Sequence, residues 1–244
     1  EDFMQVMNQY EQGPLTEKSE CLYISREGKR YQENTRILRE QKIDIIINEK
    51  LILHTMCTPQ YLTEAVLGRL RTEGIIEKVD EIEKIHIGND GKIATITMKN
   101  DAWNEKQCKK LSPVSPVKWK EEWIFHLADI LAEGMPLHNE TWGTHSCFLA
   151  KEGEVIFACE DIGRHNAIDK VVGYALLHEI DLKKCMLYSS GRMPSDMAEK
   201  VIRAGIPIAV CKAVPTAEAV ELAKKYRLTL ICAARPDRIR VYVS

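Results

Sequence analysis

Residues 160–167 hold the densest set of groups that could do chemistry. They read Glu-Asp-Ile-Gly-Arg-His-Asn-Ala and stand between an apolar run and a helical pattern. The glycine permits a sharp turn, and the free N–H groups that begin the next helix attract an anion. We therefore expect a ligand site here, although the acid and the amide could instead cap the helix. Its residues are Asp161, Gly163, Arg164, His165 and Asn166.

A second strand-to-helix turn, at residues 189–192, carries hydroxyl groups, a glycine and a guanidinium. It follows an apolar run at 185–188 and precedes a helical pattern that starts near Ser195. Phosphate is the ligand that such groups suit at a helix N-terminus. The alternative is an ordinary turn in which Ser195 caps the helix. The expected ligand contacts are Ser189, Ser190, Gly191 and Arg192.

Two later turns repeat this arrangement. Thr216 follows the apolar run at 207–211, and it either caps the next helix or contacts the ligand. After the run at 228–232 the chain offers two guanidinium groups, which suit a phosphate or the edge of a guanine as well as open solvent. The residues assigned to this last turn are Ala233, Ala234, Arg235, Pro236, Asp237 and Arg238.

An imidazole and a thiol lie two residues apart, at His145 and Cys147. A histidine beside a cysteine can lower the thiol pKa and create a nucleophile. Residues two apart in a strand share a face without necessarily touching, so we favour a buried, unreactive Cys147 and keep His145 as a ligand contact.

A zinc site is not expected. The eight cysteines are scattered, and no two form a C-x-x-C pair. A zinc-dependent deaminase, which the alternation of strands and helices would otherwise suit, needs a histidine two residues before a glutamate and a Pro-Cys-x-x-Cys helix start. His145 is followed by Ser146 and Cys147 instead. Most cysteines sit in apolar segments, as small core residues do.

Composition and charge narrow the class of protein further. The chain has 244 residues, 45% hydrophobic and 29% charged, which suffices for one large domain or two modest ones. A formal charge of −2 gives no overall basic field, so we expect neither nucleic acid nor a membrane as partner, and an anionic ligand must be met by local groups. With no apolar run of about 18 residues and no leader pattern, we expect a cytoplasmic protein with reduced thiols.

The elements that position these residues fall into three parts. Residues 1–41 are polar with Gly and Pro breakers, and they predict an irregular N-terminal arm. Residues 42–117 predict a small α+β domain that ends in an interdomain loop containing Cys108. Its elements are a hairpin at 43–57, a helix at 59–72 and a hairpin at 82–98.

Residues 118–244 predict an α/β cofactor-binding domain. After a helix at 119–133 and two strands near 147–159, helices alternate with short β-rich runs and a last strand at 239–243. Such β-α-β crossovers build a mixed sheet covered by helices on both faces, and ligands gather where the strands end. The four turns above should therefore meet at one edge of this three-layer domain.

Residues 159–173, Cys-Glu-Asp-Ile-Gly-Arg-His-Asn-Ala-Ile-Asp-Lys-Val-Val-Gly, resemble the signature of the FdhD/NarQ family of formate dehydrogenase accessory sulfurtransferases. The resemblance extends over residues 42–243 except the loop near 100–117. Further matching blocks are 56–59, 64–68, 73–76, 144–145, 189–192, 204–207, 215–216 and 219–223.

This resemblance implies a sulfur carrier. The family takes persulfide sulfur from a cysteine desulfurase and passes it to the molybdenum bis(molybdopterin guanine dinucleotide) cofactor, a bound substrate that then enters formate dehydrogenase. The resemblance also implies a cytidine-deaminase-like C-terminal domain without catalytic zinc, a homodimer, and a cofactor contact at residues 233–238, where the two guanidinium groups were found.

The sequence departs from the family at the sulfur-carrying motif. The family has a C-x-x-C pair in its interdomain loop, whereas this chain has only Cys108 there. A lone thiolate can hold a persulfide, because the chemistry needs one accessible nucleophilic sulfur. Either Cys108 serves alone, or a loop cysteine absent from this sequence serves, or sulfur transfer has been lost and the protein is a non-catalytic chaperone for the molybdenum cofactor.

Overall fold

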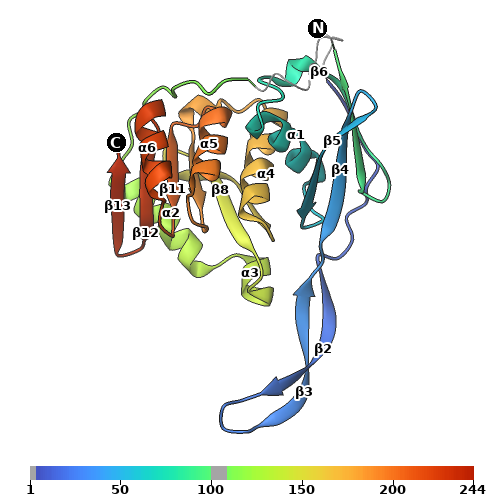
Figure 1. Ribbon diagram of the computed structural model, residues 1–244. Helices are drawn as coiled ribbons and strands as arrows, with labels where there is room; N and C mark the ends of the chain where they lie inside the picture. Colours follow the sequence, from blue (N-terminus) through green and yellow to red (C-terminus); the bar gives the residue numbers. More distant parts are fainter. Residues whose placement is uncertain (1–3, 100–108) are drawn as a thin grey trace.

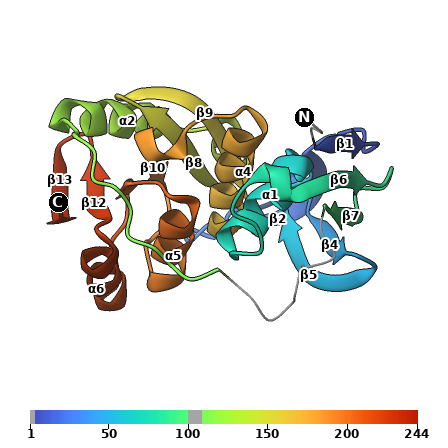
Figure 2. The same cartoon turned by 90° about the horizontal axis from the view of Figure 1, so that it is seen from above.

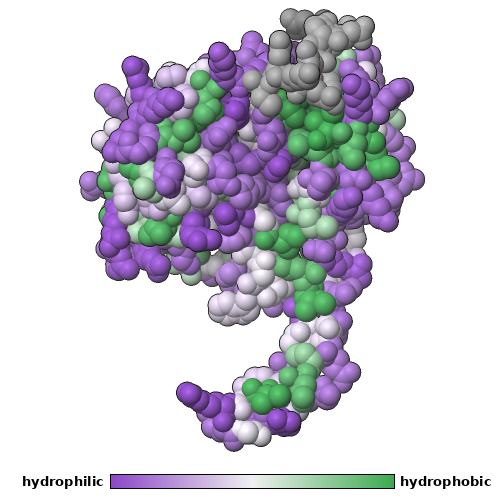
Figure 3. All heavy atoms as spheres, in the orientation of Figure 1, coloured by the Kyte–Doolittle hydropathy of each residue, from purple (hydrophilic) through white to green (hydrophobic). Residues whose placement is uncertain are grey.

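The chain folds around two sheets that lie side by side, with a two-stranded arm projecting from them (Figure 1). This computed structural model describes residues 4–99 and 109–244. The arm consists of β2 (Thr16–Ile24) and β3 (Arg30–Leu38), paired antiparallel along their whole length. Figure 3 shows apolar side chains on the surface of the arm, where Leu22, Ile24 and Tyr31 are exposed.

The first sheet and its helix come from residues 4–99. The strand order is β1 (Gln5–Asn8), β6 (Ile82–Ile87), β7 (Ile93–Met98), β4 (Gln41–Ile47) and β5 (Lys50–Cys57), with α1 (Leu62–Thr72) packed on it and η1 (Val79–Glu81) before β6. In β4 every second side chain from Ile43 to Ile47 is buried, as expected when helix α1 covers one face. Asn48 and Glu49 have positive φ angles, which suit the tight turn between β4 and β5.

The second sheet has six strands. Its order is β13 (Arg238–Val243), β12 (Thr229–Arg235), β11 (Ile208–Cys211), β10 (Met186–Ser189), β8 (His145–Lys151) and β9 (Glu154–Asp161). Strands β10, β11 and β12 are parallel, while the other neighbours are antiparallel. The helices of this part are α2 (Glu121–Glu133), α3 (Pro136–Thr141), α4 (Arg164–Leu177), α5 (Ser195–Ala204) and α6 (Ala217–Tyr226), with η2 (Leu182–Lys184) before β10.

Helices cover both faces of the second sheet, as the sequence predicts (Figure 2). Phe148 and Tyr188 belong to a core shared with α2, whereas Cys147 and Leu187 belong to a core shared with α4, α5 and α6. Neighbouring residues of one strand thus enter opposite cores, because successive side chains alternate across a sheet. The result is a three-layer arrangement in which the parallel strands β10, β11 and β12 end at a common edge.

Helices α1 and α4 cross in close contact and join the two sheets (Figure 2). A Cβ atom added to Gly68 would lie 1.7 Å from the carbonyl oxygen of Asp169, and one added to Gly173 would lie 1.8 Å from that of Glu64. Only glycine leaves room for backbones this close. The two glycines therefore set how near the two halves of the molecule come.

The strands and helices predicted from residue 42 onward are confirmed, apart from shifts of a few residues at their ends. The prediction of an irregular segment at 1–41 is wrong, because β1 extends the first sheet and β2 and β3 form the arm. The arm has largely exposed faces, so it lacks the apolar alternation that marks a half-buried strand. Helix α3 was not predicted. No helix in residues 4–99 or 109–244 is long and apolar enough to cross a membrane.

Candidate functional site

A cavity of about 420 Å³ lies where β10, β11 and β12 end, and we call it the strand-end cavity. Ser190 and Arg235 line it together with His145, so two of the four turns expected to meet at this edge reach the cavity, while Thr216 and the turn at 160–167 do not line it. Lys212 also lines it and was not predicted, since it follows a strand without a glycine or a recognisable motif. The cavity thus combines an imidazole, a hydroxyl and two cationic groups, which suits an anionic ligand.

His145 begins β8 and faces the turn after β10. Its Nδ1 lies 3.4 Å from the Ser190 hydroxyl oxygen, which also accepts a hydrogen bond from the N–H of Ser146 at 2.9 Å. Burial lowers the pKa of His145 from its ordinary value of 6.5, and the nearby Arg164 guanidinium lowers it further. Since the pKa lies below 6.5, the neutral imidazole predominates at pH 7, and this form can donate or accept a hydrogen bond without carrying charge.

Arg164 connects the first predicted turn with the second. As the first residue of α4 it packs against Gly191, whose added Cβ would lie 3.2 Å from Arg164 side-chain carbons. The Arg164 Nε is buried and has no hydrogen-bond partner among the described residues. Arg192 is exposed beside this turn. Both guanidinium groups lie near enough to His145 to lower its pKa, although neither residue lines the strand-end cavity itself.

The predicted turn at 233–238 is divided between core and surface. Ala233 and Ala234 are buried, and the N–H of Ala233 donates to the Ala213 carbonyl at 2.6 Å. Arg235 is exposed and lines the cavity, while Arg238 is exposed and paired with Asp237 at 2.6 Å. Pro236 is exposed in the turn. Arg235 is accordingly the guanidinium of this turn that the structure brings to the cavity.

Asp161 and Asn166 hold the two sheets together instead of lining the strand-end cavity. Asp161 is fully buried, and its Oδ2 accepts hydrogen bonds from the N–H and hydroxyl of Thr58 at 3.0 and 2.8 Å. Asn166 donates to the Met56 carbonyl at 2.6 Å. The helix-cap alternative is wrong for both, since Gly163 occupies the cap position of α4 without a side-chain cap.

Ser189 and Thr216 have mainly structural partners. Ser189 is fully buried, and its hydroxyl oxygen accepts the N–H of Gly191 at 3.2 Å. Thr216 caps α6 by accepting the N–H of Ala219 at 3.2 Å. The alternative in which Ser195 caps α5 is wrong, because Pro194 holds that position.

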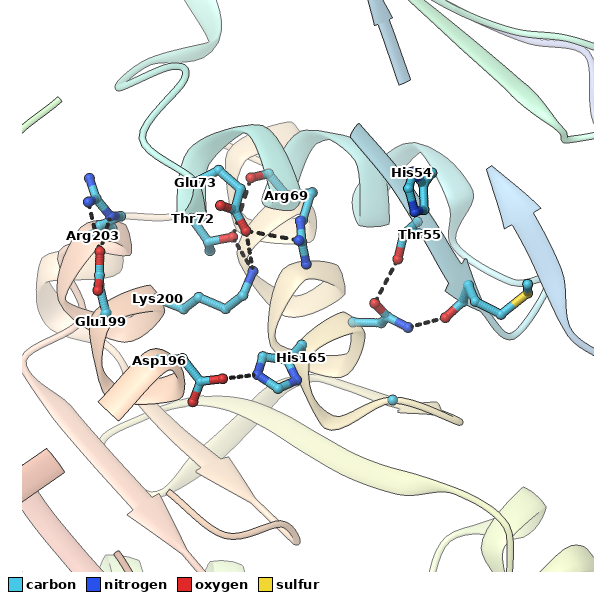
Figure 4. Close-up of a pocket in the computed structure, with 13 residues that line it drawn as sticks. His54, Thr55, Arg69, Thr72, Glu73, His165, Asp196, Glu199, Lys200 and Arg203 are labelled. Atoms are coloured by element: carbon cyan, nitrogen blue, oxygen red, sulfur yellow. Dashed lines mark hydrogen bonds and ion pairs between the residues drawn. The ribbon is translucent and has the colours of Figure 1, made fainter. Parts of the chain in front are cut away.

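A second cavity of about 630 Å³ lies between the two sheets, and we call it the inter-sheet cavity (Figure 4). Gly163, His165 and Asn166 line it, so this part of the predicted turn faces away from the strand-end cavity. His165 Nε2 lies 2.7 Å from Asp196 Oδ2. Lys200 also lines the cavity and was not predicted. Its side chain reaches back from α5 toward α1 (Figure 4).

Cys108, the predicted sulfur carrier, lies outside the described residues. Its neighbour Lys109 is described and firmly held. The Lys109 N–H donates to the Gly74 carbonyl at 3.0 Å, its Nζ lies 2.7 Å from Glu81, and its carbonyl accepts a hydrogen bond from Arg203. Arg203 also lines the inter-sheet cavity, so the described end of this segment is anchored at the rim of that cavity.

The other cysteines are mostly unsuited to nucleophilic chemistry. Of the seven in the described ranges, six are buried and only Cys21 is partly exposed. Burial raises the pKa of Cys57 to about 12, that of Cys185 to about 11, and that of Cys147 well above its ordinary value. The expectation of a buried Cys147 is confirmed. No cluster of three or more His, Cys, Asp or Glu side chains in the described residues could hold a metal ion.

The fold and the strand-end cavity define a mixed α/β protein that gathers cationic and polar groups where its parallel strands end. A model of the FdhD/NarQ family matches residues 38–244, and the chain belongs to that family. Among similar proteins, the sulfur carrier protein FdhD of Bacillus pumilus is 27% identical over 252 residues, covering 94% of this chain and 96% of its own length. Protein FdhD of Methanocaldococcus jannaschii is 32% identical over 206 residues, covering 84% and 87%.

A solved structure has the same fold. It comes from Desulfotalea psychrophila and is described as a "putative formate dehydrogenase accessory protein". It is 29% identical in sequence, superposes with a TM-score of 0.82, and covers 95% of this chain and 98% of its own. The mixed α/β architecture is therefore shared with a member of known structure.

Proposed function

We propose that this protein carries sulfur for the maturation of formate dehydrogenase. Cys108 accepts persulfide sulfur from a cysteine desulfurase, and the protein passes it to the molybdenum bis(molybdopterin guanine dinucleotide) cofactor before that cofactor enters the enzyme. Relatives along nearly the whole chain are named sulfur carriers, which supports the general role. The observation that carries the assignment to Cys108 is the burial of six other cysteines in the described residues.

The first transfer needs one accessible thiolate. The Cys108 sulfur attacks the outer sulfur of the desulfurase persulfide, a new S–S bond forms on Cys108, and the desulfurase thiolate leaves and takes up a proton. Electrons balance without an added oxidant, since one S–S bond replaces another. The anchoring of Lys109 by Gly74, Glu81 and Arg203 supports this role, because it fixes one end of the segment that bears Cys108.

The strand-end cavity is the proposed seat of the cofactor's nucleotide part. Lys212 and Arg235 line it, with Arg164 and Arg192 beside it, so phosphate groups would meet several cations despite the net charge of −2. The carboxyl ends of parallel strands are where sheets of this kind bind ligands. We further propose a cytidine-deaminase-like C-terminal domain of residues 118–244, a homodimer, and a cytoplasmic location.

Formate dehydrogenase activity in cells that lack their own sulfur carrier tests the function. We expect the wild-type chain to restore activity, and Cys108→Ala to abolish it. Cys21→Ala is the matched control, because Cys21 is the one cysteine of the described residues that is not buried, and it lies on the arm. Full activity with Cys108→Ala would support the alternative, a chaperone that binds the cofactor without transferring sulfur.

A further inference from the structure

Trp142 is unusually placed for a tryptophan. It is 81% exposed, more than any other large hydrophobic residue in the described ranges. Its backbone has φ 57° and ψ 11°, the left-handed conformation that costs energy for a bulky side chain. The residue lines the strand-end cavity together with Lys212 and Arg235. A large apolar ring is thus kept in a strained backbone position, in contact with water, beside a cationic cavity.

The segment that carries Trp142 is tightly fixed. The buried carboxylate of Glu160 accepts the N–H groups of Leu137 and His138 at 2.8 and 2.7 Å and the Thr144 hydroxyl at 2.8 Å. The N–H of Trp142 donates to the His138 carbonyl at 2.8 Å. These contacts bond the turn at its start, middle and end and fix the backbone position of Trp142 before any ligand arrives, which lowers the entropy cost of binding.

The backbone next to Trp142 is closely packed against the arm. An added Cβ on the adjacent Gly143 would lie 2.7 Å from Leu38, at the base of the arm, so the chain passes closely between the arm and the cavity. The His138 ring lies 5.7 Å from the Trp142 ring at an angle of 55°, so the two rings are tilted and not stacked face to face. The high exposure of the indole leaves ring surface free for a planar group.

We propose that Trp142 stacks on the purine base of a nucleoside diphosphate whose phosphates contact Lys212 and Arg235. Aromatic side chains bind bases by stacking, and the cations of the cavity supply the complementary phosphate contacts. This inference rests on the proposed nucleotide role of the strand-end cavity and adds the residue that recognises the base.

Calorimetry on the full chain tests the proposal with two ligands, GDP and inorganic pyrophosphate. The variant is Trp142→Gly, because glycine adopts the positive φ angle without strain and removes the ring. We expect GDP to bind about 10-fold or more weakly to this variant, in keeping with the measured range for base stacking, and pyrophosphate to bind within about twofold of wild type. Trp142→Phe should keep most of the GDP affinity.

Tyr31→Ala is the matched control, since Tyr31 is an exposed aromatic residue on the arm, and it should bind both ligands as wild type does. Equal GDP binding by Trp142→Gly and wild type would overturn the stacking role alone. An equal loss of GDP and pyrophosphate affinity would overturn it too, since a damaged cavity would then explain both. If wild type binds neither ligand, the nucleotide role of the cavity itself is wrong.

Discussion

Lys170 Nζ lies 2.6 Å from Asp161 Oδ2, and neither side chain is exposed to solvent. Thr58, from the end of the first sheet, completes the cluster by bonding both charged groups. A buried charge without a partner is costly, so each member depends on the other. Through Thr58, the pair ties the signature turn of the second sheet to the first sheet.

Removing one charge of this pair should destabilise the protein strongly. Lys170→Met leaves Asp161 buried without its cation, and we expect a loss of about 3–5 kcal/mol in the free energy of unfolding by urea denaturation. The double variant Asp161→Asn, Lys170→Met should lose less than the two single variants together. Lys224→Ala, which breaks an exposed pair with Glu221, should change stability by less than about 1 kcal/mol. Additive losses would contradict the coupling.

The glycine contacts between α1 and α4 predict a second stability effect. Gly68→Ala and Gly173→Ala each place a methyl group against a backbone carbonyl, so the helices must separate. We expect each substitution to lower the free energy of unfolding by about 1–3 kcal/mol, measured by thermal or urea unfolding. Gly13→Ala is the control, since nothing lies within 4 Å of an added Cβ there. Wild-type stability in Gly68→Ala would show that the helices do not pack this closely.

His145 should titrate below its ordinary pKa of 6.5. The unfolded chain then binds the proton more tightly than the folded chain, so the contribution of this residue to stability is present above pH 6.5 and is lost as the pH falls from there through the lower pKa of the folded state. NMR titration of the imidazole measures the pKa directly. Arg164→Gln should raise it clearly, and Arg192→Gln should raise it less, since Arg192 is the weaker influence. A larger effect of Arg192→Gln than of Arg164→Gln would contradict this order of influence.

The cations of the strand-end cavity should govern nucleotide affinity. Arg235→Ala removes a charged donor, and we expect GDP to bind about 10-fold or more weakly by calorimetry. Binding should also weaken as salt is added, with a smaller salt effect in the variant, because salt screens exposed charges. Lys224→Ala on α6 carries the same change of charge away from the cavity lining and should bind as wild type does. Unchanged affinity in Arg235→Ala would remove this residue from the site.

The strand-end turns could be predicted because alternating strands and helices place such turns at one edge of a sheet. Ser190 and Arg235 follow directly from this rule, and the structure brings both to one cavity. The structural role of Asp161 could not be predicted. Folding brings its partners Thr58 and Lys170 to it, and Thr58, which follows β5, is more than 100 residues away from Asp161 in the sequence.

The burial of charged residues on helices could not be predicted from the sequence either. Lys200 lies in a helical pattern where a lysine ordinarily faces solvent, yet its Nζ bonds the buried Asp169 at 2.8 Å and the Thr72 hydroxyl at 2.8 Å. Only the packing of α5 against α1 and α4 makes that position interior. The strands of the arm were not predicted because neither face of β2 and β3 is covered, so their sequences show no apolar alternation.

Persulfide mapping shows directly whether Cys108 accepts the sulfur. The full chain is incubated with a cysteine desulfurase and L-cysteine, its thiols are trapped by alkylation, and peptides are examined by mass spectrometry. We expect one added sulfur on Cys108 in wild type and in Cys21→Ala, and none in Cys108→Ala. Sulfur on Cys21 instead, or on no cysteine at all, would contradict it.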